Sequence, residues 1–194
     1  RRIFIAGHSL GGMLAPRVAA GDPPAGLILM APSASLPHRL IPAQAEYIMR
    51  LDGQLDERES AQLRQIRIEV GAVDQLLTSA SASTQTVVLG APAAYWRSFA
   101  ADEGPEAAAR LDLPILILHG GRDYQVTAAE IGRWRTALQD RANVTIEEFP
   151  ALNHLFIAGT GPSTPLDYRQ PGRVDAAVIE KMASWIRGVG EKKD

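Results

Sequence analysis

The stretch IFIAGHSLGGM, residues 3–13, is the strongest structural signal in the chain. Two β-branched residues, Ile3 and Ile5, alternate with Phe4 and predict a strand over residues 2–6. The pattern Gly-x-Ser-x-Gly follows over residues 7–11, and residues 13–20 have helical character. The stretch therefore predicts a strand, a very tight turn and a helix, with Ser9 on the turn.

A serine in this setting is typical of a catalytic nucleophile, because the sharp turn exposes its hydroxyl oxygen. Gly7 and Gly11 are expected to be small because the strand and helix backbones approach closely there. The backbone N–H of Leu10, directly after the serine, is expected to point at a developing oxyanion. These features make Ser9 the candidate nucleophile.

The composition is that of an ordinary globular domain. The 194 residues are 46% hydrophobic and 22% charged, with a formal net charge of −2. This nearly neutral balance gives no reason to expect nucleic acid or an anionic membrane surface as a partner. The lack of cysteine excludes disulfides, thiolate metal sites and a cysteine nucleophile. No apolar run reaches the roughly 18 residues of a membrane span, so we expect a soluble protein, cytoplasmic or exported.

Apolar runs elsewhere predict more strands. Residues 25–32 (AGLILMAP) and 113–120 (LPILILHG) are continuously apolar, as expected for strands buried on both faces of a parallel sheet. Residues 143–150 alternate more and are expected nearer the sheet edge. Helices are expected over residues 128–142 and 174–189. Strands separated by helical crossovers indicate an α/β fold with a mostly parallel sheet flanked by helices.

Residues 33–104 interrupt this alternation. No clear strand is expected there, and the sections that look helical are residues 43–51, 57–77, 85–89 and 91–99. An insertion of this size between two core strands predicts a helical cap over the active-site face. The core is then formed by residues 1–32 and 105–194.

Two downstream residues complete a candidate catalytic triad. A serine hydroxyl needs a base to remove its proton, and the base works best when a third group orients it. Asp123 follows the strand at 113–120, and His154 follows the strand at 143–150. Both lie at carboxyl ends of strands, where open parallel sheets place their sites. The order serine, acid, histidine also fits this kind of turn, so Ser9, Asp123 and His154 are predicted to be catalytic.

The other histidines and carboxylates fit these roles less well. His8 lies inside the turn, but its position points it away from Ser9, which favours packing or the lining of a pocket. His119 precedes two glycines, yet the oxyanion loop of lipases lies before the nucleophile. Asp112 precedes the strand at 113–120, so it is expected on the wrong face, away from the site at the carboxyl ends of the strands. No cluster has metal-ligand spacing, and no glycine-rich loop fits a phosphate or dinucleotide motif.

Three motifs carry a family resemblance: GHSLGG (7–12), LPILILHGGRDYQV (113–126) and NHLFIAGTGPSTPLDY (153–168). From Ile3 to about Ile186, the chain resembles the C-terminal two thirds of an α/β-hydrolase of the dienelactone hydrolase and serine-esterase kind. The resemblance implies an α/β-hydrolase fold with the same three catalytic residues. It also implies hydrolysis of carboxylic esters without metal or organic cofactor.

The resemblance also has consequences for the surroundings of the site. The loop that ends at Tyr168 is expected beside the site, where Tyr168 would shape a substrate pocket. Tyr124 and His8 are further candidates for lining that pocket. Members of this family carry several strands before the nucleophile turn, and an early loop supplies the second oxyanion donor. Only eight residues precede Ser9 here. We therefore expect a missing N-terminal section, or another chain, to complete the sheet.

Several functions remain compatible with these residues. The favoured one is a serine hydrolase that cleaves a small ester through an acyl-enzyme intermediate. A thioesterase, acyltransferase or peptidase would use the same triad, and the sequence does not separate them. Haloalkane dehalogenases and epoxide hydrolases are disfavoured, because their nucleophile at this turn is an aspartate. A non-catalytic fragment or scaffold of the same fold is the remaining alternative. The intact triad argues against a scaffold, whereas a fragment without the second oxyanion donor could be inactive by itself.

Overall fold

The computed structural model describes residues 3–79, 83–100 and 104–191. The chain divides into two compact units. The first consists of Arg1–Ala34 together with Gly104–Asp194, and the second of Ser35–Glu103. The role of the second unit as a cap stays a prediction.

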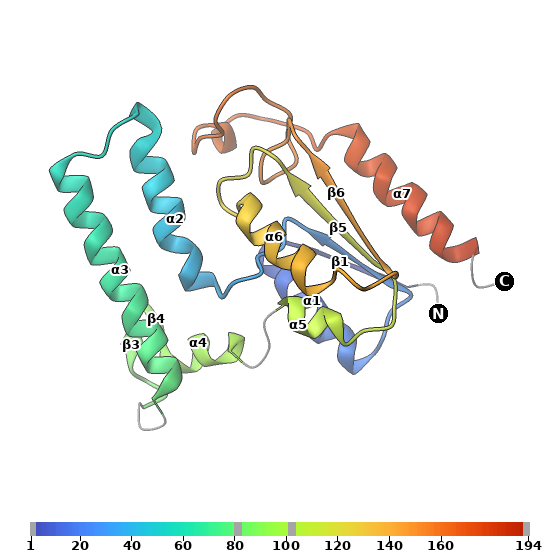
Figure 1. The fold of residues 1–194 in the computed structure, drawn as a ribbon, viewed down its shortest axis with the longest axis horizontal. Coiled ribbons are helices and arrows are strands. Elements are labelled where there is room, and N and C mark those ends of the chain that lie inside the picture. Colours follow the sequence, from blue (N-terminus) through green and yellow to red (C-terminus); the bar gives the residue numbers. More distant parts are fainter. Residues whose placement is uncertain (1–2, 80–82, 101–103, 192–194) are drawn as a thin grey trace. The chain divides into compact units, whose positions relative to one another are not determined.

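A four-stranded parallel sheet lies at the centre of the first unit (Figure 1). Its strands are β1 (Phe4–His8), β2 (Gly26–Met30), β5 (Ile115–Gly120) and β6 (Val144–Phe149), in the order β1-β2-β5-β6. β2, β5 and β6 lie within the ranges predicted for them, and β6 is at an edge of the sheet as expected. β1 continues to His8, two residues beyond its predicted end at residue 6. Pairing of β1 with a further section or another chain stays a prediction.

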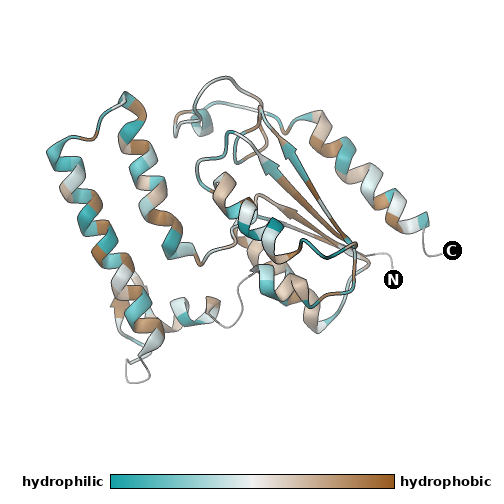
Figure 2. Ribbon diagram, in the orientation of Figure 1, coloured by the Kyte–Doolittle hydropathy of each residue, from teal (hydrophilic) through white to brown (hydrophobic). Residues whose placement is uncertain are grey.

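Helices cover both faces of this sheet because its side chains alternate between the two faces. One cluster joins alternate residues of β2 and β5 to three helices: α1 (Leu10–Gly21), α5 (Gly104–Ala109) and α6 (Ala128–Ala137). The intervening strand residues, Ile28, Leu116 and Leu118, pack with α7 (Ala176–Glu191) on the other face. Figure 1 shows α7 on the opposite side of the sheet from the other three helices. The result is a three-layer α/β/α core around strands that are mostly hydrophobic (Figure 2).

The second unit is mostly helical. It contains α2 (Pro37–Met49), a 3₁₀ turn (Arg50–Asp52), α3 (Glu57–Thr78), β3 (Val87–Val88), β4 (Ala91–Pro92) and α4 (Ala93–Phe99). A capping box begins α3: the Glu59 N–H donates to Asp56 Oδ1 at 2.7 Å, and the Asp56 N–H donates to Glu59 Oε2 at 3.1 Å. Residues along α2 and α3 alternate between hydrophilic and hydrophobic (Figure 2), as expected for helices that bury only one face.

Two predictions for this unit are wrong. Residues 85–89 form no helix, because Val87 and Val88 pair with β4 in a hairpin. The connecting residues Leu89 and Gly90 have φ of 49° and 73°. Two consecutive positive φ values are typical of a tight hairpin turn. The first helix begins at Pro37 and not at residue 43, since proline suits the first turn of a helix, where its lost N–H costs little.

The close approach of β1 and α1 depends on Gly7. A Cβ at Gly7 would overlap the backbone carbonyl of Gly11 and lie 2.8 Å from the backbone nitrogen of Gly12. At Gly11, in contrast, a Cβ would meet no atom within 4 Å. The predicted need for a residue without a side chain is therefore confirmed at Gly7 and wrong at Gly11, where a Cβ would point into open space.

This difference gives a matched pair of variants. We expect Gly7→Ala to lower the free energy of unfolding by about 3 kcal/mol or more, since only backbone atoms could yield to the new methyl group. Gly11→Ala should leave stability unchanged or raise it by up to about 1 kcal/mol through its better helix propensity. Urea denaturation of both variants checks this. Equal stability of the two variants would show that the contact around Gly7 is not tight.

Candidate active site

Ser9 lies on the turn between β1 and α1, at the carboxyl end of the sheet. Its φ and ψ are 55° and −120°, a conformation that a non-glycine residue adopts only under local strain. Two backbone hydrogen bonds hold the turn: the Ser9 N–H donates to the Met30 carbonyl at 2.8 Å, and the Met13 N–H donates to the Ser9 carbonyl at 3.1 Å. Leu10 is the first residue of α1, so its N–H has no acceptor within the helix.

Asp123 and His154 are brought together in the structure. His154 Nδ1 lies 2.7 Å from Asp123 Oδ2, and the side chains of His154 and Asp123 are 5% and 0% exposed. The other carboxylate oxygen, Oδ1, accepts the N–H groups of Gln125 at 2.8 Å and Val126 at 2.9 Å. An ionised carboxylate only accepts hydrogen bonds. The pair therefore places a proton on His154 Nδ1 and leaves Nε2 as the basic nitrogen.

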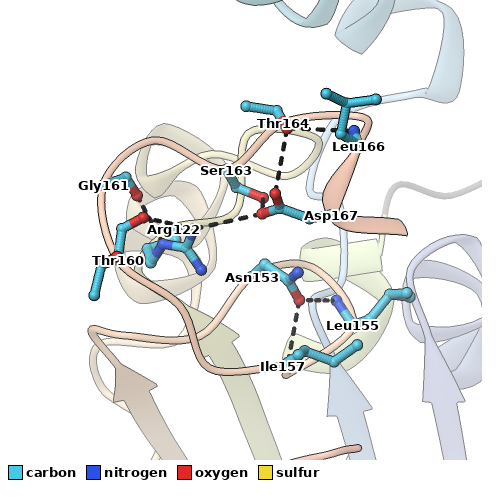
Figure 3. A network of polar contacts seen from close by, with 10 residues as sticks. All are labelled: Arg122, Asn153, Leu155, Ile157, Thr160, Gly161, Ser163, Thr164, Leu166 and Asp167. Atoms are coloured by element: carbon cyan, nitrogen blue, oxygen red, sulfur yellow. Dashed lines mark hydrogen bonds and ion pairs between the residues drawn. The ribbon is translucent and has the colours of Figure 1, made fainter. Parts of the chain in front are cut away.

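A tight loop holds His154 in place. The side-chain oxygen of Asn153 accepts the N–H groups of Leu155 at 3.0 Å and Ile157 at 3.1 Å (Figure 3). The Phe156 N–H donates to the Asn153 carbonyl at 2.9 Å, and Phe156 is buried with a φ of 58°. Asn153 thus bridges the residues on both sides of a strained position, which fixes the backbone next to His154.

The segment that follows His154 is tied to the aspartate loop by Arg122 (Figure 3). Arg122 Nε donates to the Gly161 carbonyl at 2.7 Å, and Nη2 lies 3.4 Å from Asp167 Oδ2. Asp167 also accepts the hydroxyls of Ser163 at 3.0 Å and Thr164 at 3.2 Å. Burial raises the pKa of Asp167, but these hydroxyl contacts and the charge of Arg122 outweigh it, so the pKa is lowered. Because Arg122 immediately precedes Asp123, this network joins the loop of Asp123 to the segment that follows His154.

Two hollows lie around these loops. One of about 340 Å³ is lined by His8, Met30, Leu155, Phe156, Ile157, Gly172 and Val174. The other, of about 310 Å³, is more polar and is lined by Arg122, Asn153, Ile157, Ala158, Gly159, Thr160, Asp167, Gln170, Pro171 and Gly172. Of the three predicted pocket residues, only His8 lines either hollow. The rings of Tyr124 and Tyr168 lie 6.2 Å apart, and the buried Tyr168 hydroxyl has no hydrogen-bond partner within the described part of the chain.

The predicted triad is joined only in part. Asp123 and His154 share a direct hydrogen bond, whereas Ser9 Oγ makes none to either of them among residues 3–79, 83–100 and 104–191. The residue before Ser9, His8, does contact His154: its Nε2 lies 2.8 Å from the His154 carbonyl oxygen. This contact joins positions 146 residues apart. Sequence reasoning assigned His8 to packing or a pocket wall, because no local pattern marks such a distant contact.

The structure also bears on metals and membranes. Within the described ranges, no group of three histidine, aspartate or glutamate side chains is arranged to hold a metal ion. Of the helices in those ranges, none is both long and apolar enough to cross a membrane.

Comparison with known sequences gives two matches. Residues 1–168 match a family model described as "Alpha/beta hydrolase family". The chain is 35% identical over 185 residues to Esterase EstD from Thermotoga maritima, a match that covers 95% of this chain and 42% of that protein. The chain therefore spans less than half the length of this curated relative.

Comparison with solved structures shows a similar fold. BpoC from Mycobacterium tuberculosis H37Rv matches with a TM-score of 0.51 and 16% identity, over 97% of this chain and 68% of that chain. A protein described as a dienelactone hydrolase, from Klebsiella pneumoniae subsp. pneumoniae MGH 78578, matches with a TM-score of 0.49 and 16% identity, over 95% of this chain and 51% of that chain. At 16% identity the match to BpoC concerns the fold alone, and the second match, with a TM-score under 0.5, supports no conclusion.

Proposed function

This chain belongs to the α/β-hydrolase family, and on that basis we propose that it hydrolyses carboxylic esters with Ser9, Asp123 and His154. The observation that carries the proposal is the 2.7 Å hydrogen bond between His154 Nδ1 and Asp123 Oδ2. It leaves His154 Nε2 free to act as a base, next to a serine turn that is strained. The 35% identity to a protein named as an esterase supports ester chemistry.

The first half of the proposed reaction forms an acyl-enzyme. Ser9 Oγ attacks the ester carbonyl carbon while His154 Nε2 takes the hydroxyl proton. The carbonyl oxygen becomes an oxyanion, and the Leu10 N–H is placed at the start of α1 to donate to it. Asp123 stabilises the imidazolium through Nδ1–H. The C–O bond to the alcohol then breaks, and His154 gives its proton to the departing oxygen.

The second half releases the acid. His154, neutral again, takes a proton from a water molecule as the water oxygen attacks the acyl carbon. A second oxyanion forms in the same place, and it collapses to break the bond to Ser9 Oγ. His154 returns the proton to Oγ. The products are an alcohol and a carboxylic acid, and the protein regains its starting state.

The second unit is our candidate for the part of the protein that determines substrate specificity. Ser35–Glu103 is inserted in the sequence between β2 and β5. We propose that it acts as a cap that selects the acyl group. Thioester or peptide cleavage and acyl transfer would need the same three side chains, so they are distinguished from ester hydrolysis by the substrate alone.

Substrate comparison tests this proposal. The purified protein is assayed with p-nitrophenyl acetate, p-nitrophenyl butyrate, a butyryl thioester and butyryl p-nitroanilide, each against a buffer blank. We expect fast release of p-nitrophenol from at least one ester and slower cleavage of the thioester and the anilide. Faster thioester cleavage would assign a thioesterase. Ester cleavage no faster than in buffer would contradict the proposed function.

A further inference from the structure

We propose that His8 is a positioning residue that fixes the base against the nucleophile turn. The inference rests on the proposed function, because it assigns a role within the same site. His8 would act through the backbone of His154 and not on the substrate. Its ring N–H would set how far His154 stands from Ser9, the residue that follows His8 in the chain.

The hydrogen bond itself defines the direction of the contact. His8 Nε2 lies 2.8 Å from the His154 carbonyl oxygen. A carbonyl oxygen only accepts, so Nε2 must carry the proton and donate it. The His8 ring thus holds the backbone of His154 through its own N–H. Loss of the His8 N–H would remove this hydrogen bond from the His154 carbonyl.

The His8 ring extends from backbone that is part of the sheet. His8 is the last residue of β1 and pairs with Met30 in β2. The next N–H, of Ser9, donates to the Met30 carbonyl at 2.8 Å. The backbone from His8 to the serine is thus part of the sheet ladder. The His8 side chain has only two rotatable bonds, so from this backbone it can hold the loop of His154 in one position.

Ring contacts support the same role. The ring centroids of His8 and His154 lie 4.7 Å apart at an angle of 49°, and those of His8 and Phe156 lie 6.3 Å apart at 64°. Phe156 is buried at 1% exposure and belongs to the strained turn after His154. His8 therefore contacts the carbonyl of His154, the ring of His154 and the ring of the buried Phe156.

Two substitutions separate the hydrogen bond from the bulk of the ring. His8→Leu removes the donor, whereas His8→Gln keeps an N–H at a similar reach and cannot gain a charge. We expect His8→Leu to lower kcat by about 100-fold, because small misplacements of a catalytic group have effects of this size. The KM should stay within about twofold, since ground-state binding is not affected. His8→Gln should keep kcat within about fivefold of the wild type, since the donor is retained.

The split between kcat and KM and the rescue by glutamine are readouts that a purely structural role would not move. NMR gives another readout that needs no turnover. The carbon-13 signal of the His154 carbonyl should shift in His8→Leu, where its hydrogen bond is lost, and stay near the wild-type position in His8→Gln.

Each outcome bears on His8 separately from the enzyme assignment. A wild-type kcat in His8→Leu would overturn the proposal, as would an equal loss of kcat in both variants or an unchanged His154 carbonyl signal in His8→Leu. Absence of ester cleavage by the wild type would instead contradict the proposed function. In that case the carbonyl signal still shows whether His8 binds the backbone of His154.

Discussion

Replacing Ser9 with alanine is expected to lower kcat for ester hydrolysis on the order of 10⁶-fold. The substitution removes only the hydroxyl oxygen, so the acyl-enzyme cannot form and His154 has no nucleophile to activate. The backbone hydrogen bond from the Ser9 N–H to the Met30 carbonyl is retained. Steady-state kinetics with the best p-nitrophenyl ester measure the loss.

Ser184→Ala provides the matched control for this variant. Ser184 is exposed on α7, and its hydroxyl donates to the Lys181 carbonyl of the same helix at 3.0 Å. Its replacement should leave kcat within about twofold, as expected for a surface change away from the site. A Ser9→Ala enzyme with a kcat near that of Ser184→Ala would rule out Ser9 as the nucleophile.

Asp123→Asn is expected to lower kcat by about 10⁴-fold. The asparagine oxygen can still accept the N–H groups of Gln125 and Val126, so the loop keeps its shape. Its amide NH₂ group then faces His154 Nδ1, where the carboxylate accepted before. Nδ1 must become an acceptor, and the single proton of the neutral ring moves to Nε2. A ring in this tautomer cannot take a proton from Ser9.

Asp112→Asn is the control for the loss of one carboxylate. Asp112 lies before β5, its side chain is 95% exposed, and it pairs with Arg141 at 2.8 Å. Because an exposed ion pair contributes only about 0–1 kcal/mol, kcat should not change measurably. The KM should be unchanged in both variants. A loss in Asp123→Asn that appears in KM alone would assign Asp123 to substrate binding.

Much of the fold could be predicted because the strands are simple. Residues 115–120 of β5 are all buried, and a short apolar run between Pro114 and two glycines has few other structures open to it. The hairpin at Val87–Val88 and Ala91–Pro92 was missed for the opposite reason. Its strands have two residues each, too few to show any period. Its turn includes Leu89 at positive φ. Leucine rarely adopts this conformation, so a leucine at this position does not indicate a turn.

The site could be predicted only where residues carry local signals. Asp123 and His154 each follow a strand, and the structure joins them. The link between Arg122 and Asp167 spans 45 residues, and the contact of His8 with the His154 carbonyl is longer still. Both contacts depend on how loops that are distant in the sequence pack against each other in the folded protein. Neither has a pattern in sequence that would reveal it.

The most direct test of the central claim is mass spectrometry of the enzyme after acid quenching during turnover of p-nitrophenyl butyrate. We predict a butyryl group on the peptide that contains Ser9 and no such adduct in the Ser9→Ala variant. A butyryl adduct that persists in Asp123→Asn would show that acylation comes first and that deacylation also needs the base. A butyryl group on another residue, or continued turnover with Ser9 never acylated, would contradict a serine acyl-enzyme mechanism at this site.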